Sequence, residues 1–251
     1  MFINTSIFNF QLKRFFLILT LALCVSAAAH AQYDRNIVQR LTKVDYNRWH
    51  FGFILGLGFN DFRVVPNNYV DEDGNRWYAA SGGLKPSFVV GMIVDLRLVD
   101  YLNLRFTPCL GLGQRQFQYS AFNPAGEVVD RINTSVSCVT MEVPLYLKYS
   151  AKRYGNVRPY IIAGAGALFN MNLDRDKAIL LKPVDVEIAF GIGFDIYLEY
   201  FKLCPEIKFG FGLLDELNRN HPEAEGTREF ICTQSTKRLT ARMLTITFNF
   251  E

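Results

Sequence analysis

Apolar side chains alternate with small or polar ones in eight segments of this chain, most of them longer than ordinary strands. The clearest segment runs from His50 to Asn60. Its alternate positions are all large and apolar: Phe51, Phe53, Leu55, Leu57 and Phe59. A period of two residues is typical of a β-strand whose two faces meet different surroundings. Strands of soluble proteins average about 5–6 residues, whereas a tilted strand needs about 9–11 to cross a bilayer.

None of the eight apolar rows contains a charged residue. The other seven rows start at Phe88, Leu102, Val139, Ile161, Val184, Leu203 and Leu244. Uncharged outward rows of this length predict an all-β fold, an eight-stranded antiparallel transmembrane β-barrel of the outer-membrane type. A secreted soluble barrel or sandwich would share the alternation. The strand length and the uncharged rows argue against that alternative.

The opposite faces of these strands carry glycines and charges. Five of them contain Gly-x-Gly, which weakens an ordinary strand but suits a crowded, narrow barrel. Five basic and five acidic side chains share these faces and are predicted to line the lumen in a structural role. They are Asp95, Arg97, Arg105, Arg115, Glu142, Lys148, Glu187, Asp195, Glu206 and Lys208. A balanced set of charges indicates a packed polar lumen, and a turn centred on Asp100 places Asp95 opposite Arg105.

The connections between the predicted strands alternate in length. Short turns are expected at residues 99–101, 150–157 and 199–201, and long loops at 61–84, 120–134, 172–182 and 215–237. Short turns at the periplasmic rim and long loops outside the cell are the pattern of outer-membrane barrels. Pro108, Pro144 and Pro205 fall inside strands, where bulges are expected to accommodate them.

The first residues have the form of a secretory signal peptide. Lys13-Arg14 precedes fifteen uncharged residues, and Ala29-His30-Ala31 fits the cleavage pattern. A membrane anchor is the alternative, but fifteen residues fall short of the roughly 20 that a spanning helix needs. The predicted division is a signal peptide at 1–31, a periplasmic lead-in at 32–47 and the barrel at 48–251. The predicted location is the outer membrane.

Composition and motifs exclude several other functions. Without Lys13 and Arg14, 27 − 2 = 25 basic residues face 24 acidic ones, too few for a nucleic-acid binder that relies on phosphate contacts. No Gly-x-Gly extends to a dinucleotide motif. His50 and His221 are too isolated to indicate a metal site or a lipase site. We predict no catalytic residue, no cofactor, no metal and no small-molecule substrate.

Two further patterns favour structural readings. Asp71-Glu72-Asp73-Gly74-Asn75 is similar to a calcium-binding loop, but Gly82 occupies the position where the final glutamate belongs. A turn at Asp73-Gly74 is the preferred interpretation, and a weak calcium site stays open. Four cysteines lie beyond the predicted signal peptide and are predicted to be unpaired and structural: Cys109, Cys138, Cys204 and Cys232.

Several segments resemble PorT-type proteins. Residues 32–64, with His50-Phe51-Gly52-Phe53 opening the first strand, resemble the start of their mature chains. MEVPLYLKY contains the Glu-x-Pro-x-x-x-Lys pattern as Glu142, Pro144 and Lys148. RPYIIAGAGA, GIGFDIYLEY and PEIKFGFGL look like their later strands. One departure is Glu251, which follows Phe250 where many such barrels end on an aromatic residue.

The resemblance implies a non-enzymatic outer-membrane component of the type IX secretion system of Bacteroidetes, which exports cargo such as proteases and adhesins. Its partners would be outer-membrane lipid and other secretion-system subunits. A filled eight-stranded barrel could not pass a folded cargo domain. The contacts are therefore expected at the rims, with the lead-in favoured. The alternatives are a general small barrel for envelope integrity or adhesion through its loops, and an outer-membrane enzyme.

Overall fold

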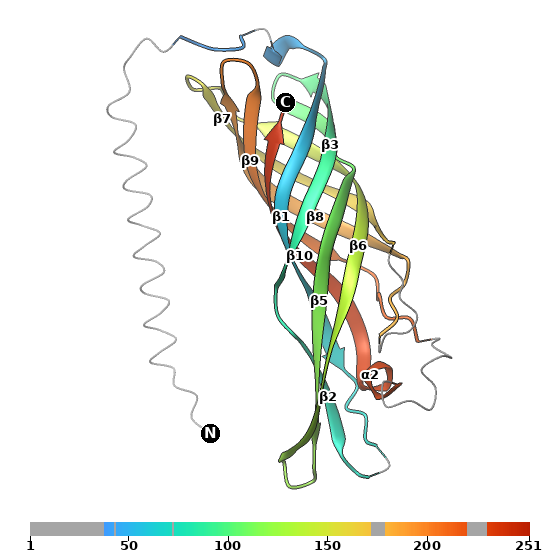
Figure 1. The fold of residues 1–251 in the computed structure, drawn as a ribbon. Helices are drawn as coiled ribbons and strands as arrows, with labels where there is room; N and C mark the ends of the chain where they lie inside the picture. The colour runs from blue at the N-terminus through green and yellow to red at the C-terminus, as the bar shows by residue number, and fades with distance from the viewer. Residues whose placement is uncertain (1–37, 43, 72, 172–178, 220–229) are drawn as a thin grey trace. The chain divides into compact units, whose positions relative to one another are not determined.

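The structure is a computed structural model that describes residues 38–42, 44–71, 73–171, 179–219 and 230–251. The chain divides into two compact units, Met1–Val38 and Gln39–Glu251. All of the strands belong to the second unit (Figure 1). The predicted signal peptide and the lead-in up to residue 37 lie outside the described residues, as do parts of the third and fourth predicted loops.

Ten strands and two short helices make up the described fold. The strands are β1 (Trp49–Pro66), β2 (Arg76–Ser81), β3 (Lys85–Val99), β4 (Leu102–Phe106), β5 (Cys109–Phe122), β6 (Val128–Ser150), β7 (Val157–Asn170), β8 (Val184–Tyr197), β9 (Lys202–Gly212) and β10 (Thr236–Phe250). The helices are η1 (Val44–Tyr46) and α2 (Phe230–Ser235). No helix among the described residues is long and apolar enough to cross a membrane.

The antiparallel sheet closes on itself. Strand β1 pairs with both β10 and β3, and the ring runs through β9, β8, β7 and β6. Between β3 and β6, the strands β4 and β5 together occupy one position, separated only by Thr107-Pro108. The ring therefore has eight strand positions, and the predicted eight-stranded barrel is confirmed.

The predicted apolar rows face outward. Phe51 is 67% exposed, Met92 63% and Ile161 57%. Leaving so many large apolar side chains on the outside of a protein in water would be costly, because apolar surface is driven out of water. Facing lipid removes that cost. Alternate residues of the same strands, such as Ile54 and Tyr146, are buried inside.

The polarity of the two faces is exchanged toward one end of the barrel. On β5, the outward Leu110 and Leu112 give way to Gln114 and Gln116, while the inward Phe117 is fully buried. An apolar core fills this end. It includes Phe62, Trp77, Ala79, Phe117, Tyr119, Val136, Leu181, Leu217, Leu239 and Ala241. The exchange marks where the lipid-facing band stops and where side chains pack as they do in a soluble protein.

Two of the predicted long loops, at 61–84 and 120–134, contain long stretches of strand. Strand β1 continues to Pro66, β2 pairs with β5, and β5 and β6 meet at a turn closed by Asn123 N–H donating to Glu127 O at 3.0 Å. These strands project beyond the rest of the barrel, at the end away from Glu251 (Figure 1). The prediction was wrong here because it followed outward apolar rows, which stop at the edge of the band. The three short turns lie where they were expected.

No bulge lies at these three prolines, contrary to expectation: Pro144 and Pro205 keep the register of their strands, and Pro108 lies in the break between β4 and β5. The pairing with β6 keeps one register on both sides of Pro108. The flanking pairs are Phe106 with Leu145 and Cys109 with Glu142. Thr107 N–H still reaches Pro144 O at 3.4 Å, and Met92 N–H reaches Pro108 O at 3.0 Å. Because proline removes only its own N–H, the neighbouring bonds hold the register.

We expect the turn between β5 and β6 to lie outside the cell and the turn between β6 and β7 in the periplasm. A cysteine at the exposed Ala125 should react with an impermeant maleimide on intact cells, and one at the exposed Lys152 should react only after lysis. The native cysteines are buried thiols, so the background should be low. Labelling of Lys152→Cys but not Ala125→Cys on intact cells would reverse the orientation.

Candidate functional site

The inward charges form one continuous polar lumen. Of the ten predicted lumen charges, eight are almost completely buried: Asp95, Arg105, Arg115, Lys148, Glu187, Asp195, Glu206 and Lys208. Glu142 faces the lumen but keeps partial exposure. Arg97 lies at the short-turn rim, where it pairs with the exposed Asp100. A buried charge is tolerated only when it is paired, so the partners of each group determine what the lumen can do.

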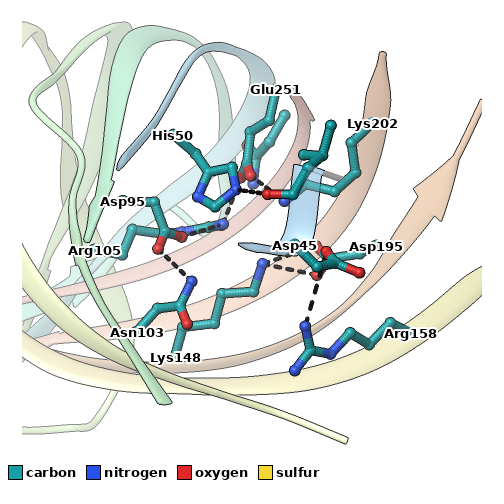
Figure 2. Close-up of polar contacts among 12 residues, drawn as sticks. Asp45, His50, Asp95, Asn103, Arg105, Lys148, Arg158, Asp195, Lys202 and Glu251 are labelled. Atoms are coloured by element: carbon teal, nitrogen blue, oxygen red, sulfur yellow. Dashed lines mark hydrogen bonds and ion pairs between the residues drawn. The ribbon is translucent and has the colours of Figure 1, made fainter. Parts of the chain in front are cut away.

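Arg105 is the centre of the lumen network. Its Nε donates to Asp95 Oδ2 at 2.9 Å, the partner that the predicted register gave. Its guanidinium also meets Glu206 at 3.4 Å and forms an ion pair with Glu251. Its carbon Cζ lies 5.5 Å from the ring centre of Tyr160. One cation thus faces three buried carboxylates, of which Figure 2 labels Asp95 and Glu251.

Two lysines complete the network near the short-turn rim. Lys148 Nζ donates to both oxygens of Asp195, at 2.8 and 2.9 Å. Lys202 pairs with Glu251, whose backbone also pairs with that of Lys202. Asn103 Nδ2 donates to Asp95 at 2.6 Å. Figure 2 shows these side chains converging from both sides of the lumen.

The middle of the lumen is crowded around Glu206. This carboxylate accepts from the Tyr160 hydroxyl at 2.8 Å and lies 3.6 Å from Lys208. Lys208 in turn interacts electrostatically with Glu142 and Glu187. A Cβ at Gly193 would lie 2.4 Å from the Tyr160 ring, so glycine is required for the ring to fit. The prediction that glycines relieve crowding is confirmed at this position.

At the far end of the polar lumen, one cation faces a surplus of carboxyl groups. Arg115 lies 3.5 Å from Glu216, and Asn170 Nδ2 donates to Glu216 at 3.0 Å. Burial raises the pKa of Glu216 to about 7; Arg115 opposes this rise, and the nearby Asp185 reinforces it. Glu216 follows β9 and lies outside the membrane-spanning strands. Its carboxyl group therefore holds a proton well above the usual pH range of a glutamate.

The end of the lead-in closes the short-turn rim. Asp45, in η1, accepts from the Tyr197 hydroxyl at 2.6 Å and pairs with Arg153 at 3.4 Å. His50 Nε2 donates to Val44 O at 2.7 Å. Arg153 also contacts Arg40 O and lies over the ring of Tyr197 at 3.5 Å. These contacts fix the segment from Arg40 to His50 against the turn between β6 and β7.

Little space remains at this rim. The cavity between η1 and the lumen charges has a volume of about 10 Å³. Asp45, His50, Asn103, Lys148, Asp195 and Lys202 are among its lining residues. A cavity of this volume holds at most about one water molecule. This cavity therefore leaves no room between η1 and the lumen charges for a solute larger than water.

The residues of the PorT-type motif have separate structural tasks. Phe51 and Phe53 face lipid, and Phe53 stacks on Phe250 with ring centres 4.7 Å apart. A Cβ at Gly52 would lie 2.3 Å from Phe250 O. In the later strand, Glu142 and Lys148 face the lumen, and Pro144 lies beside the break between β4 and β5. The structure does not bring the two halves of the motif together as one site.

Sequence reasoning missed several charged residues of the lumen. Asp185, Lys202 and Glu251 each extend a predicted inward row by one more step, and continuing the alternation would have found them. Glu216 belongs to no strand, and the pairing of Asp45 with Arg153 joins positions 108 residues apart. No local pattern marks either of these.

The turn preferred at Asp73-Gly74 is present. Asp71 Oδ1 accepts from Asn75 N–H at 2.8 Å, Asp71 Oδ2 accepts from Trp77 Nε1 at 3.0 Å, and Gly74 has φ of 80°, as a turn requires. Glu72 lies outside the described residues, as does His221. Within the described ranges, no group of three or more His, Cys, Asp or Glu side chains could hold a metal ion. The four cysteines among the described residues are buried thiols, and Cys24 lies outside these residues.

A closed ring of eight antiparallel strand positions, apolar outside and ion-paired inside, defines an outer-membrane β-barrel. The family described as "Outer membrane protein beta-barrel domain" matches residues 30–218, and the chain belongs to this family. It is a small outer-membrane protein in contact with lipid. No curated protein sequence matches the chain.

Two solved barrels are similar in structure. Neisserial surface protein A is 11% identical, with 81% of this chain and 98% of that one covered and a TM-score of 0.40. The outer membrane protein OprG from Pseudomonas aeruginosa is 13% identical, with 79% and 93% covered and a TM-score of 0.37. The assignment rests on the family match alone.

The Asp95–Arg105 pair should show strong coupling. Arg105→Ala leaves the buried Asp95 without a cation and leaves Glu206 and Glu251 with one lysine each, so it should cost about 3–5 kcal/mol. Asp95→Ala leaves Arg105 with Glu206 and Glu251 and should cost less. The two single losses should sum to more than the loss in the double variant. Urea unfolding of the refolded barrel measures all three, with Asp95 and Arg115, at the far end of the polar lumen, as a control pair. An additive Asp95–Arg105 cycle would contradict the network.

The stability of the barrel should fall as the pH rises from about 4.5 to 7. The folded protein keeps a proton on Glu216 up to about pH 7, whereas the unfolded chain releases it near 4.5. The folded state therefore binds more protons in this window, so its stability is present below it and lost above it. Denaturant unfolding at pH 5, 6, 7 and 8 should show a smaller slope in Glu216→Gln. The exposed Glu127→Gln is the control, and equal slopes in all three proteins would refute the assignment.

Proposed function

We propose that this protein is a non-enzymatic structural component of the outer membrane that acts through its rims. The observation that carries the proposal is the closed lumen, in which four lysine and arginine side chains pair with four carboxylates. Those residues are Arg105, Lys148, Lys202, Lys208, Asp95, Asp195, Glu206 and Glu251. Opening such a network to a passing solute would leave buried charges unpaired. A role as a conduit is therefore disfavoured.

The resemblance to PorT-type proteins favours a structural or assembly role in the type IX secretion system. Contacts with other subunits would come from the short-turn rim. There, Tyr46 of the lead-in is 77% exposed, and Tyr200 of the turn between β8 and β9 is 84% exposed. Exposed tyrosines on a fixed surface are typical anchors of protein interfaces. Because Asp45 and Arg153 fix η1, this surface would be preformed.

Loss of the protein should leave type IX cargo inside the cell envelope while detergent sensitivity stays normal. Complementation with Tyr46→Ser/Tyr200→Ser should fail to restore cargo export although the barrel inserts, because both anchors are removed. Tyr78→Ser, an exposed tyrosine of β2 at the other end, is the matched control. Cargo in the medium is measured by immunoblot, and insertion by gel migration with and without boiling. Normal export from the full deletion would contradict a secretion role.

A general role in envelope integrity or adhesion is the second candidate. The observation that favours it is the ordered extension of β2, β5 and β6 beyond the lipid-facing band, supported by its own apolar core. Such a surface could hold a ligand outside the cell. Normal cargo export combined with impaired attachment or detergent resistance in the deletion strain would favour this reading.

A further inference from the structure

Three arginines gather on the outer surface where the lipid-facing band ends. The outward row of β1 passes from Phe59 to Asp61 and Arg63, and that of β10 passes from Leu244 to Arg242, Thr240 and Arg238. The two strands are hydrogen-bonded neighbours. Their outward pairs are Asp61 with Arg242, Arg63 with Thr240, and Val65 with Arg238. Arg63, Arg238 and Arg242, all exposed, therefore form one patch, the arginine patch.

Most of the donors in this patch are uncommitted. Within the part of the chain that the structure describes, neither Arg63 nor Arg242 has an ion-pair partner. Arg238 gives one Nη2 donor to Leu213 O at 2.8 Å and keeps the rest. The neighbouring Asp61 uses its Oδ1 for Phe62 N–H and the Ser81 hydroxyl. Three cations against one carboxylate leave the patch net positive.

The depth of the patch suits a lipid headgroup. Arg242 lies two residues beyond Leu244 toward the long-loop end, and Arg63 lies four residues beyond Phe59. These separations are roughly 7 and 13 Å along a strand. On a strand tilted by about 45°, these distances correspond to about 5–9 Å beyond the hydrocarbon. The polar layer of a bilayer leaflet has about this thickness. Arg242 and Arg63 thus lie at the level of the lipid phosphates, and Arg238 lies on the outer side of them.

The patch does not continue onto β5 and β6 at the same depth. At the end of the band on β5 and β6, the outward residues are the uncharged Gln114, Gln116, Ser135 and Ser137. A general attraction to anionic headgroups would place cations on every side. A cluster of cations on two adjacent strands, with uncharged outward residues at this depth on β5 and β6, favours one bound molecule.

We propose that Arg63, Arg238 and Arg242 hold the phosphate groups of a phosphorylated glycolipid of the outer leaflet. The guanidinium fork matches phosphate oxygens in pairs, which an ammonium group cannot do. The outward apolar residues Phe59 and Leu244, directly below the patch, would meet the acyl chains of the same molecule. The site depends on the long-loop end facing outside, and it does not depend on a secretion role.

Native mass spectrometry of the purified barrel in detergent tests the site. The probes are bisphosphorylated lipid A, its dephosphorylated form and phosphatidylglycerol. Arg63→Gln/Arg242→Gln should weaken binding of bisphosphorylated lipid A at least about tenfold. It should leave the weak binding of the dephosphorylated form unchanged. The matched control is Arg76→Gln/Arg131→Gln, which removes two exposed arginines of β2 and β6 and should bind as the unmodified protein does.

Three results would overturn the proposal. The first is equal lipid A affinity in the patch variant and the unmodified protein, and the second is equal loss in the control. The third is phosphatidylglycerol binding that is as tight and as dependent on the patch, which would point to anionic lipid in general. Boiling-dependent gel migration verifies folding. If the glutamine variant does not fold, Arg63→Lys/Arg242→Lys should still lose several-fold affinity through the missing fork, and full affinity would refute the site.

Discussion

The pairing of Arg105 with three carboxylates is the interaction on which the closed lumen depends. A buried guanidinium costs several kcal/mol unless its donors are used, and each carboxylate around it has the same need. Asp95 comes from β3, Glu206 from β9 and Glu251 from beyond β10. One side chain of β4 thus connects both sides of the barrel. The narrow lumen of an eight-stranded barrel brings these groups within hydrogen-bond distance of one another.

The two halves of the lumen satisfy their charges differently. Near the short-turn rim, cations and carboxylates are balanced, and the lead-in adds Asp45 with Arg153. Near the other end, Arg115 is the nearest cation to Glu216, while Asp185 adds a further carboxyl. Where cations are lacking, protonation replaces pairing, which explains the raised pKa of Glu216. Beyond that point the interior becomes apolar and needs no charge.

The barrel itself was predictable from sequence because its constraint is local. Every second residue must suit lipid, so rows such as Phe51 to Phe59 reveal both the strand and its orientation. The turn around Asp100 was short enough to give the register of Asp95 and Arg105. Beyond the membrane the large apolar side chains face inward, as Phe62 and Phe117 do. The outward rows of these strands are then no longer apolar and do not look like lipid-facing rows. This is why β2 and the β5–β6 extension were read as loops.

The remaining features depend on contacts between distant segments. Nothing near Asp45 in sequence indicates Arg153 or Tyr197, and Glu216 acquires its environment only when β5, β7 and β8 come together. Glu251 is instructive, because it first looked like a departure from an aromatic chain end. Phe250 keeps its outward place against Phe53, and the next residue must then point inward, where Arg105 and Lys202 require a carboxylate. The alternation that sets the strands therefore also places the charge that completes the lumen.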